Sequence, residues 1–249
     1  ADTTYDYSVL AVDTSENSSG VAGPVSVTTP APPGDLLVAY DFAGPGPGVE
    51  DRSGNGRDGV LVAPAAIDAG GYVDDGLETT GGGGGVDLGG MDIAADAFTI
   101  SMWMNADDFG VRDARLVSKS TGTAANDHLW MVSTFKNNRL RFRLNTDAGA
   151  DTTTLIGNDA TISAQTWHFV AATYDGADMR LFIDGVEAGS TAKSGSVTVD
   201  PTMDAWIANN PAATAQSFDG RIDNFRIHTR ALSASELATL ATTPITSSP

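Results

Sequence analysis

The stretch Trp167-His-Phe-Val-Ala-Ala-Thr-Tyr-Asp-Gly176 decides the fold, together with Leu181-Phe-Ile-Asp-Gly185 just after it. Each stretch is a short apolar run that ends in Asp-Gly. This pair is typical of the tight turn of a β-hairpin, because glycine adopts the positive φ that such a turn needs. The two stretches therefore predict antiparallel strands, with Asp175 and Asp184 as turn residues.

Similar runs recur between residues 36 and 241, with turn residues between them. They lie at residues 37–42, 59–62, 85–88, 98–104, 116–118, 129–135, 140–145, 167–174, 179–183, 205–208 and 222–228. So many short strands with regular turns predict an all-β fold, a two-sheet antiparallel jelly-roll sandwich. One short C-terminal helix is predicted after Ser233-Ala-Ser-Glu236, because this capping box satisfies free N–H groups where a helix begins.

The composition excludes several classes of protein. The chain has 249 residues, a formal net charge of −18 and no cysteine, so it has no disulfides or thiolate metal sites. Its negative field repels phosphate backbones and anionic lipids, so neither nucleic acid nor a membrane surface is an expected partner. No apolar stretch reaches the roughly 18 residues of a spanning helix, and residue 1 does not open a signal peptide. We expect a mature or excised piece of a larger chain.

Four segments are predicted along the chain. Residues 1–29 are a β-hairpin with the runs Tyr5-Asp-Tyr-Ser-Val-Leu-Ala-Val-Asp13 and Val25-Ser-Val27, and it resembles the last two strands of a fibronectin type III domain. Residues 30–35 are a proline-rich linker, because closely spaced prolines keep the chain extended and stiff. Residues 36–241 form the jelly-roll domain, and residues 242–249 form a tail.

Six phrases stand in a fixed order within the jelly-roll segment. They are Val38-Ala-Tyr-Asp-Phe42, Asp51-Arg-Ser-Gly-Asn-Gly-Arg-Asp-Gly59, Phe98-Thr-Ile-Ser-Met-Trp103, the two stretches quoted first, and Phe218-Asp-Gly-Arg-Ile-Asp-Asn-Phe-Arg-Ile227. This order resembles bacterial laminin G-like jelly rolls of the concanavalin A-like lectin/glucanase superfamily. The resemblance implies the fold but leaves function open, because this fold carries lectins, hydrolases, lyases and adhesion modules.

A candidate calcium loop lies at Asp51-x-Ser53-x-Asn55-Gly56, where three oxygen-bearing side chains alternate before a glycine. This is the spacing of the first half of a calcium loop. The resemblance implies Asp223 of the last strand as a further ligand, and Asp41 is the next candidate. We predict a structural Ca²⁺ that joins the first and last strands, so that chelation lowers the melting temperature. The alternative is that the loop side chains only cap a turn.

A candidate ligand face lies around Lys136-Asn-Asn-Arg139, where a two-residue Asn-Asn turn is expected. Strand alternation then puts Trp130, Arg141 and Arg143 on one outward face. The expected ligand-binding residues are Trp130, Arg141, Arg143, His128, Lys136 and Arg139. An indole covers the apolar face of a sugar, and guanidinium groups bind carboxylates or sulfates, so the expected partner is an acidic polysaccharide or glycan. The alternative is that these arginines only aid solubility.

The other three tryptophans are assigned by their surroundings. Trp103 and Trp167 lie within apolar runs and are expected to fill the core between the sheets. Trp206 is a secondary candidate for stacking on a ligand.

Catalysis is not expected from this chain. The Glu-x-Asp-x-x-Glu strand of jelly-roll glucanases is missing, the five glutamates are scattered, and the three histidines lack metal-ligand spacing. We predict a non-catalytic, calcium-stabilised carbohydrate-binding module of a larger polysaccharide-active enzyme or adhesin, secreted or on the cell surface of a bacterium. The alternatives are a structural or adhesive spacer without sugar specificity, and a polysaccharide lyase or glycoside hydrolase.

Overall fold

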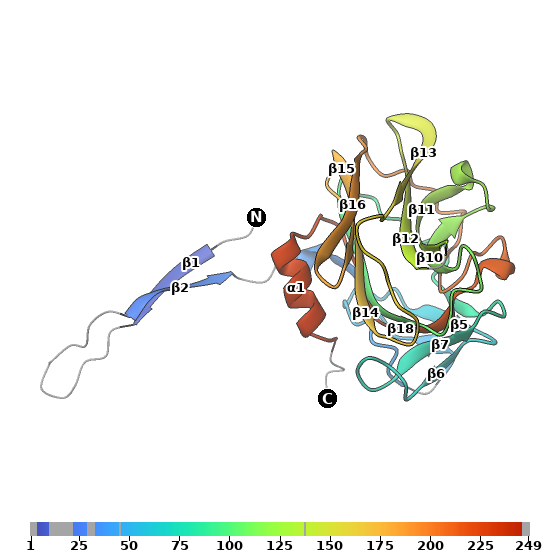
Figure 1. Ribbon diagram of the computed structural model, residues 1–249, viewed down its shortest axis with the longest axis horizontal. Helices are drawn as coiled ribbons and strands as arrows, with labels where there is room; N and C mark the ends of the chain where they lie inside the picture. The colour runs from blue at the N-terminus through green and yellow to red at the C-terminus, as the bar shows by residue number, and fades with distance from the viewer. Residues whose placement is uncertain (1–3, 10–21, 29–32, 45, 137, 246–249) are drawn as a thin grey trace, which may run out of the picture. The chain divides into compact units, whose positions relative to one another are not determined.

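The computed structural model of the protein describes residues 4–9, 22–28, 33–44, 46–136 and 138–245. The chain divides into two compact units, Ala1–Asp35 and Leu36–Pro249 (Figure 1).

The first unit is a β-hairpin. β1 (Thr4–Val9) pairs antiparallel with β2 (Ala22–Thr28), and Tyr5 lies opposite Val27. The fibronectin type III origin of this hairpin stays a prediction. The first half of the expected proline-rich linker, residues 30–32, lies outside the described residues, and its second half forms the short 3-10 helix η1 (Pro33–Asp35).

The second unit is a sandwich of two antiparallel sheets of eight strands each (Figure 1). The front sheet consists, in order, of β13 (Gly149–Ile156), β12 (Arg139–Thr146), β11 (His128–Phe135), β10 (Arg115–Ser120), β17 (Ala205–Ile207), β8 (Gly85–Asp87), β5 (Gly59–Val62) and β4 (Gly48–Val49). The back sheet consists of β16 (Val186–Ala192), β15 (Asp178–Ile183), β14 (His168–Tyr174), β9 (Phe98–Ala106), β18 (Asp219–His228), β7 (Gly76–Thr80) and β6 (Ala66–Asp68), while β3 (Leu36–Tyr40) pairs with β18. The predicted all-β, two-sheet jelly-roll sandwich is confirmed.

The hydrophobic core lies between the two sheets. Along β9 the alternate residues Phe98, Ile100, Met102 and Met104 are buried in it, as the period of two along a strand requires. The ring of Phe98 meets the ring of Phe142 from the front sheet edge-on, with centroids 5.8 Å apart. Contacts of this kind between the sheets hold the sandwich together through apolar burial.

The predicted C-terminal helix is α1 (Ala234–Thr242), and it covers part of the outer face of the back sheet. The Ser233 hydroxyl accepts a hydrogen bond from the N–H of Glu236, and a carboxylate oxygen of Glu236 accepts one from the N–H of Ser233. Leu237 of α1 is fully buried against Phe169 and Phe182. The capping box therefore begins the helix where the sequence predicts, and one apolar side chain anchors it.

Candidate ligand-binding face

Trp130 belongs to the core, which corrects the outward face expected for it. β11 pairs with β12 so that Trp130 lies opposite Leu144, and the turn between the strands has three residues, 136–138, instead of two. Lys136 takes a positive φ of 43° in this turn. One extra turn residue reverses which side chains of β11 face inward, and Trp130 is 0% exposed. The physical reason is hydrophobic: the expected register would leave Trp130 and Val132 in water.

A third arginine joins Arg141 and Arg143 on the outer face of the front sheet, the face turned away from the core. Arg115 of β10 lies opposite Ser133 of β11, and Ser133 lies opposite Arg141 of β12. Residues opposite each other in antiparallel strands share a face of the sheet, and so do residues two apart in one strand. The sequence did not point to Arg115, because strand alternation does not tell which strands are neighbours.

Trp206 lies on the same outer face and is half-buried. It is opposite Ser118, which is opposite Met131, which is opposite Arg143. Three strand spacings separate Trp206 from Arg143, which is about 14 Å. The indole near the arginines is therefore Trp206 and not Trp130.

His128 is fully buried between Arg115 and Arg143. Its Nε2 lies 3.2 Å from Nη2 of Arg115, and its Nδ1 lies 2.8 Å from the carbonyl oxygen of Ala124. Because a guanidinium group only donates, Nε2 accepts the hydrogen bond from Arg115 and Nδ1 donates to Ala124. Burial, followed by the charges of Arg115 and Arg143, lowers the pKa of His128 to about 4. The imidazole is thus neutral near pH 7.

The three guanidinium groups disfavour one another's charge. Burial is the largest cause that lowers the pKa of Arg115 to about 9 and that of Arg141 to about 10, and the neighbouring arginines add to it. The pKa of Arg143 is lowered by burial as well, and the Asp113 carboxylate opposes the shift in all three. Oδ1 of Asp113 lies 3.6 Å from Nη1 of Arg141. Positive charge is therefore concentrated here at an electrostatic cost, within a strongly acidic protein.

Lys136 and Arg139, the remaining two expected ligand residues, lie at the end of the hairpin beside Phe135. The Lys136 ammonium is 5.4 Å and the Arg139 guanidinium 5.5 Å from the centroid of the Phe135 ring. Arg139 also donates a hydrogen bond of 2.6 Å to Oδ1 of Asn158. Lys136 is exposed, so these two cations form a rim and not the floor of the face.

Trp103 and Trp167 lie outside the core, which corrects the expectation that they fill it. Met102 and Met104 face the core, so Trp103 between them points to the outer face of the back sheet. The ring of Tyr72 stacks on Trp103 with centroids 3.6 Å apart and meets Trp167 edge-on at 5.9 Å. The other residues of β9 on this face are polar, Thr99, Ser101 and Asn105, so the alternation along the strand already indicated that Trp103 faces outward.

Hydrogen bonds within the chain close the expected calcium loop. Oδ1 of Asp51 accepts hydrogen bonds from the N–H groups of Ala39 and Ser53, at 3.0 and 2.9 Å. Oδ2 accepts from the Ser53 hydroxyl at 2.8 Å and from the N–H of Arg57 at 3.0 Å. Asn55 donates its amide to backbone carbonyls at the start of β3. Although burial opposes it, these hydrogen bonds lower the pKa of Asp51, as expected for a turn-capping carboxylate.

Asp41 and Asp223 have partners of their own. Oδ2 of Asp41 pairs with Nε of Arg52 at 2.9 Å, and the Asp223 carboxylate accepts hydrogen bonds from the N–H groups of Val73 and Asn224. Within the described part of the chain, no group of three or more His, Asp or Glu side chains could hold a metal ion. Asp51, Asp41 and Asp223 thus each have partners within the chain, and a calcium ion at these residues and Asn55 stays a prediction.

Ser163, His168 and Asp184 form a hydrogen-bond chain in the order of a catalytic triad, which the sequence did not suggest. Nδ1 of His168 lies 2.6 Å from Oδ2 of Asp184, and Nε2 lies 2.9 Å from the Ser163 hydroxyl. The backbone N–H of Ser163 also donates to Nε2, at 3.0 Å, so an amide already uses the acceptor that a general base needs. These hydrogen bonds connect the segment before β14 to the turn between β15 and β16.

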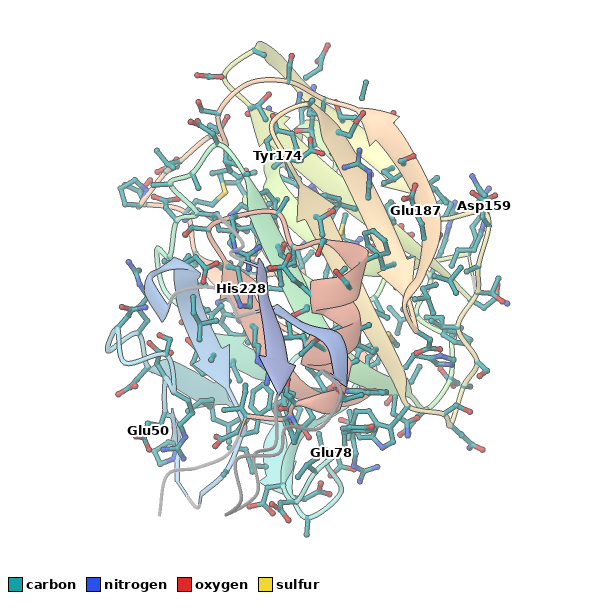
Figure 2. The ribbon with its side chains drawn as sticks, turned by 90° about the vertical axis from the view of Figure 1, so that its left-hand side faces the viewer. Glu50, Glu78, Asp159, Tyr174, Glu187 and His228 are labelled. Carbon is teal, nitrogen blue, oxygen red and sulfur yellow. The ribbon has the colours of Figure 1, made fainter. Side chains whose placement is uncertain are left out.

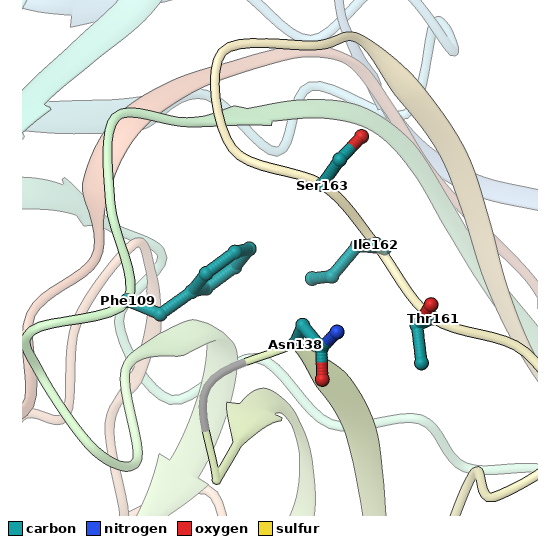
Figure 3. A pocket seen from close by; sticks show the side chains of 5 residues that line it. All are labelled: Phe109, Asn138, Thr161, Ile162 and Ser163. Atoms are coloured by element: carbon teal, nitrogen blue, oxygen red, sulfur yellow. The ribbon is translucent and has the colours of Figure 1, made fainter.

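The surroundings of Ser163 agree with this structural role. Ser163 borders a pocket of about 510 Å³ that is also lined by Phe109, Asn138, Thr161 and Ile162. Figure 3 shows the Ser163 hydroxyl pointing away from Phe109 and Asn138.

The labelled glutamates do not form a catalytic pair. Figure 2 shows Glu50, Glu78 and Glu187 in three separate regions of the molecule. Glycoside hydrolysis needs two carboxyl groups within about 10 Å of each other. Glu187 on β16 and Glu78 on β7 are five strand spacings apart in the back sheet, about 24 Å, so these two do not form such a pair.

Comparison with known proteins identifies the class. A family model described as the concanavalin A-like lectin/glucanases superfamily matches residues 80–238. The chain therefore belongs to this superfamily, with a laminin G-like domain. Among the described residues, no helix is long and apolar enough to cross a membrane.

Curated relatives match only over short parts of their length. Human pappalysin-1 is 27% identical over 112 residues, which are 41% of this chain and 7% of the relative. Mouse pappalysin-1 is 24% identical over 148 residues, which are 55% of this chain and 9% of the relative. The chain thus spans less than a tenth of the curated relatives that it matches.

Solved structures of similar fold are binding domains. Domain 4 of AbnA, an extracellular arabinanase from Geobacillus stearothermophilus in complex with arabinotriose, has a TM-score of 0.63 and 19% identity, over 83% of this chain and 98% of that one. The ligand-binding domain of botulinum neurotoxin serotype D, in complex with N-acetylneuraminic acid, has a TM-score of 0.63 and 14% identity, over 84% and 51%. At these identities the likeness shows the fold alone.

Proposed function

We propose that this chain is a non-catalytic glycan-binding module whose binding face is the outer face of the front sheet. The carrying observation is the row of arginines there, Arg115, Arg141 and Arg143, in a protein whose formal net charge is −18. The similar domains from the arabinanase and the neurotoxin, which were solved with sugars bound, support a sugar as the ligand.

An acidic glycan fits this face best. Guanidinium groups recognise carboxylates and sulfates through paired, charge-assisted hydrogen bonds. Trp206, about 14 Å from Arg143 across the sheet, offers a flat ring to a neighbouring sugar unit of the same chain. Lys136 and Arg139 at the hairpin end extend the positive rim. The indole of Trp130 has no part in this proposal, because it is buried in the core.

The proposed context is a larger secreted or cell-surface protein of a bacterium, either a polysaccharide-active enzyme or an adhesin. The extracellular arabinanase that carries a domain of this fold supports such a context. The proposal does not depend on calcium, because no residue of the arginine face belongs to the expected calcium loop.

A glycan array with the purified chain tests the proposal. We expect the wild type to bind a subset of acidic glycans and Arg143→Ala to lose that binding, because Arg143 is the most exposed of the three arginines. Arg180→Ala is the matched control: Arg180 lies on β15 and pairs with Asp175 and Asp178. A wild type that binds no glycan on the array would favour the spacer alternative, and release of reducing ends or unsaturated uronates would favour the enzyme alternative.

A further inference from the structure

Three buried guanidinium atoms on the outer face of the front sheet have no acceptor. They are Nε of Arg115, Nη2 of Arg141 and Nε of Arg143, and none has a hydrogen-bond partner among the described residues. Arg115 is 0% and Arg141 4% exposed, so both side chains are more than nine-tenths buried. An unpaired charged donor away from water is costly, and these three atoms are themselves out of reach of solvent, so the described residues leave the positive charge of the cluster partly uncompensated.

The other ends of the arginines are held in place. Nη1 of Arg115 donates to the carbonyl oxygen of Asp113 at 2.6 Å, and its Nη2 donates to the neutral His128. Nε of Arg141 donates to the Ser133 hydroxyl at 3.3 Å. Oδ1 of Asp113, at 3.6 Å from Arg141, is too far for a hydrogen bond. Asp127 also favours the charge of Arg143, so the three guanidinium groups face the carboxylates of Asp113 and Asp127.

We infer that the half-exposed Arg143 binds one oxyanion group of the glycan, a sugar carboxylate or a sulfate ester, and that the charges of Arg115 and Arg141 behind it favour this anion. The inference rests on the proposed function and names the chemistry that the face recognises. A guanidinium group pairs with a carboxylate or sulfate through charge-assisted hydrogen bonds, and the uncompensated positive charge of the cluster adds to the attraction. Arg115 lies on the other side of the buried His128 from Arg143, so it acts through its charge and not through contact.

The charge of the whole protein restricts the ligand further. With a formal net charge of −18, the molecule repels a densely charged polymer beyond the reach of these arginines. The site is therefore suited to an isolated acidic group in an otherwise neutral glycan, and not to a polyphosphate or a heavily sulfated chain.

Calorimetric titration of the full chain with paired monosaccharides tests the inference. The probes are D-glucuronate against glucose and galactose 6-sulfate against galactose, with inorganic sulfate as a competitor. We expect at least one anionic sugar to bind about tenfold more tightly than its neutral partner, since each charged hydrogen bond contributes a factor of this size. Sulfate is expected to compete with it.

Two variants are expected to change this affinity in opposite directions. Arg143→Ala removes a donor and should weaken binding of the anionic sugar about tenfold. Asp113→Asn removes the carboxylate that repels the ligand and should strengthen binding about threefold. Arg180→Ala, on the back sheet, should leave it within about twofold. If Arg143→Ala does not fold, the affinity of Asp113→Asn and the comparison of anionic with neutral sugars still test the inference.

Equal binding of charged and neutral sugars would overturn the inference. So would a loss of affinity in Asp113→Asn, because that pattern marks general damage and not removal of a competing charge. If the array shows binding of neutral glycans only, the proposed function stands and the oxyanion site falls. If the anionic monosaccharides bind but no glycan on the array does, the oxyanion site stands and the proposed function falls.

Discussion

The outer faces of the two sheets differ in their chemistry and in what covers them. On the back sheet, Phe169 and Phe182 are covered by Leu237 of α1, so a segment of the chain itself removes apolar surface from water. On the front sheet, Arg115 and Arg141 are as deeply buried, yet one donor of each has no acceptor among the described residues, and Arg143 beside them is half-exposed. The covered apolar face is a completed piece of the fold. The charged face, with its uncompensated positive charge, indicates a place for an anionic ligand.

The largest expected effect is on stability, and it compares a tryptophan in the core with a tryptophan on the outer face of the back sheet. Trp130→Ala leaves a large cavity in the core and should lower the free energy of unfolding by about 3–5 kcal/mol. Trp103→Ala removes a half-buried ring beneath Tyr72 and should cost about 1–2 kcal/mol. Urea denaturation measures both. Equal losses in the two variants would mean that the assignment of inner and outer indoles is wrong.

A smaller effect concerns Asp223, the carboxylate opposite Trp103 on the back sheet. Burial raises its pKa to about 6 from the ordinary aspartate value of 3.8. The folded state therefore holds this proton more tightly than the unfolded state, so stability falls as pH rises from about 4 through 6. The shift corresponds to about 2–3 kcal/mol in the free energy of unfolding, since one pKa unit is about 1.4 kcal/mol.

Denaturation of the wild type and of Asp223→Asn at pH 4 and pH 7 measures this contribution. The variant cannot ionise, so its loss of stability over this range should be smaller than that of the wild type. An identical change in the two proteins would show that Asp223 has an ordinary pKa. The arginine face provides the contrast, because His128 between its guanidinium groups stays neutral over most of this range.

The smallest effect is expected from removing calcium at the Asp51 loop. Since the oxygens of Asp51 already accept hydrogen bonds from Ala39, Ser53 and Arg57, EDTA should change the melting temperature by less than about 1 °C. Differential scanning calorimetry with and without added Ca²⁺ measures this. A loss of several degrees would show that a cation joins the strands after all.

Much of the fold was readable from the sequence, and the strands that were missed have a common cause. All eleven predicted runs overlap observed strands, but β4, β6, β7, β13 and β16 were not predicted. Four of these five are the edges of the two sheets. Edge strands are less buried and more polar, as in Gly149–Ile156, so they lack the apolar run that marks a strand.

The candidate site was readable only in part. The sequence placed Arg141, Arg143 and His128 close together because they belong to one hairpin. It missed Arg115, which reaches them through the β10–β11 pairing. It also exchanged the indoles, placing Trp130 outside and Trp103 inside. β11 carries large apolar residues on both faces, so its pattern does not select one, whereas on β9 Trp103 stands among polar residues and its apolar ring was wrongly taken for a core side chain.

The sequence alone determined the local features: alternating apolar runs, Asp-Gly turns and the Ser233 capping box, and with them an all-β sandwich that ends in a short helix. These features depend on neighbours a few residues apart. Only the tertiary structure decided which face of each strand meets the core and which strands lie side by side. The physical reason is that a single turn residue reverses every side chain of a strand, and only packing against the opposite sheet selects one register.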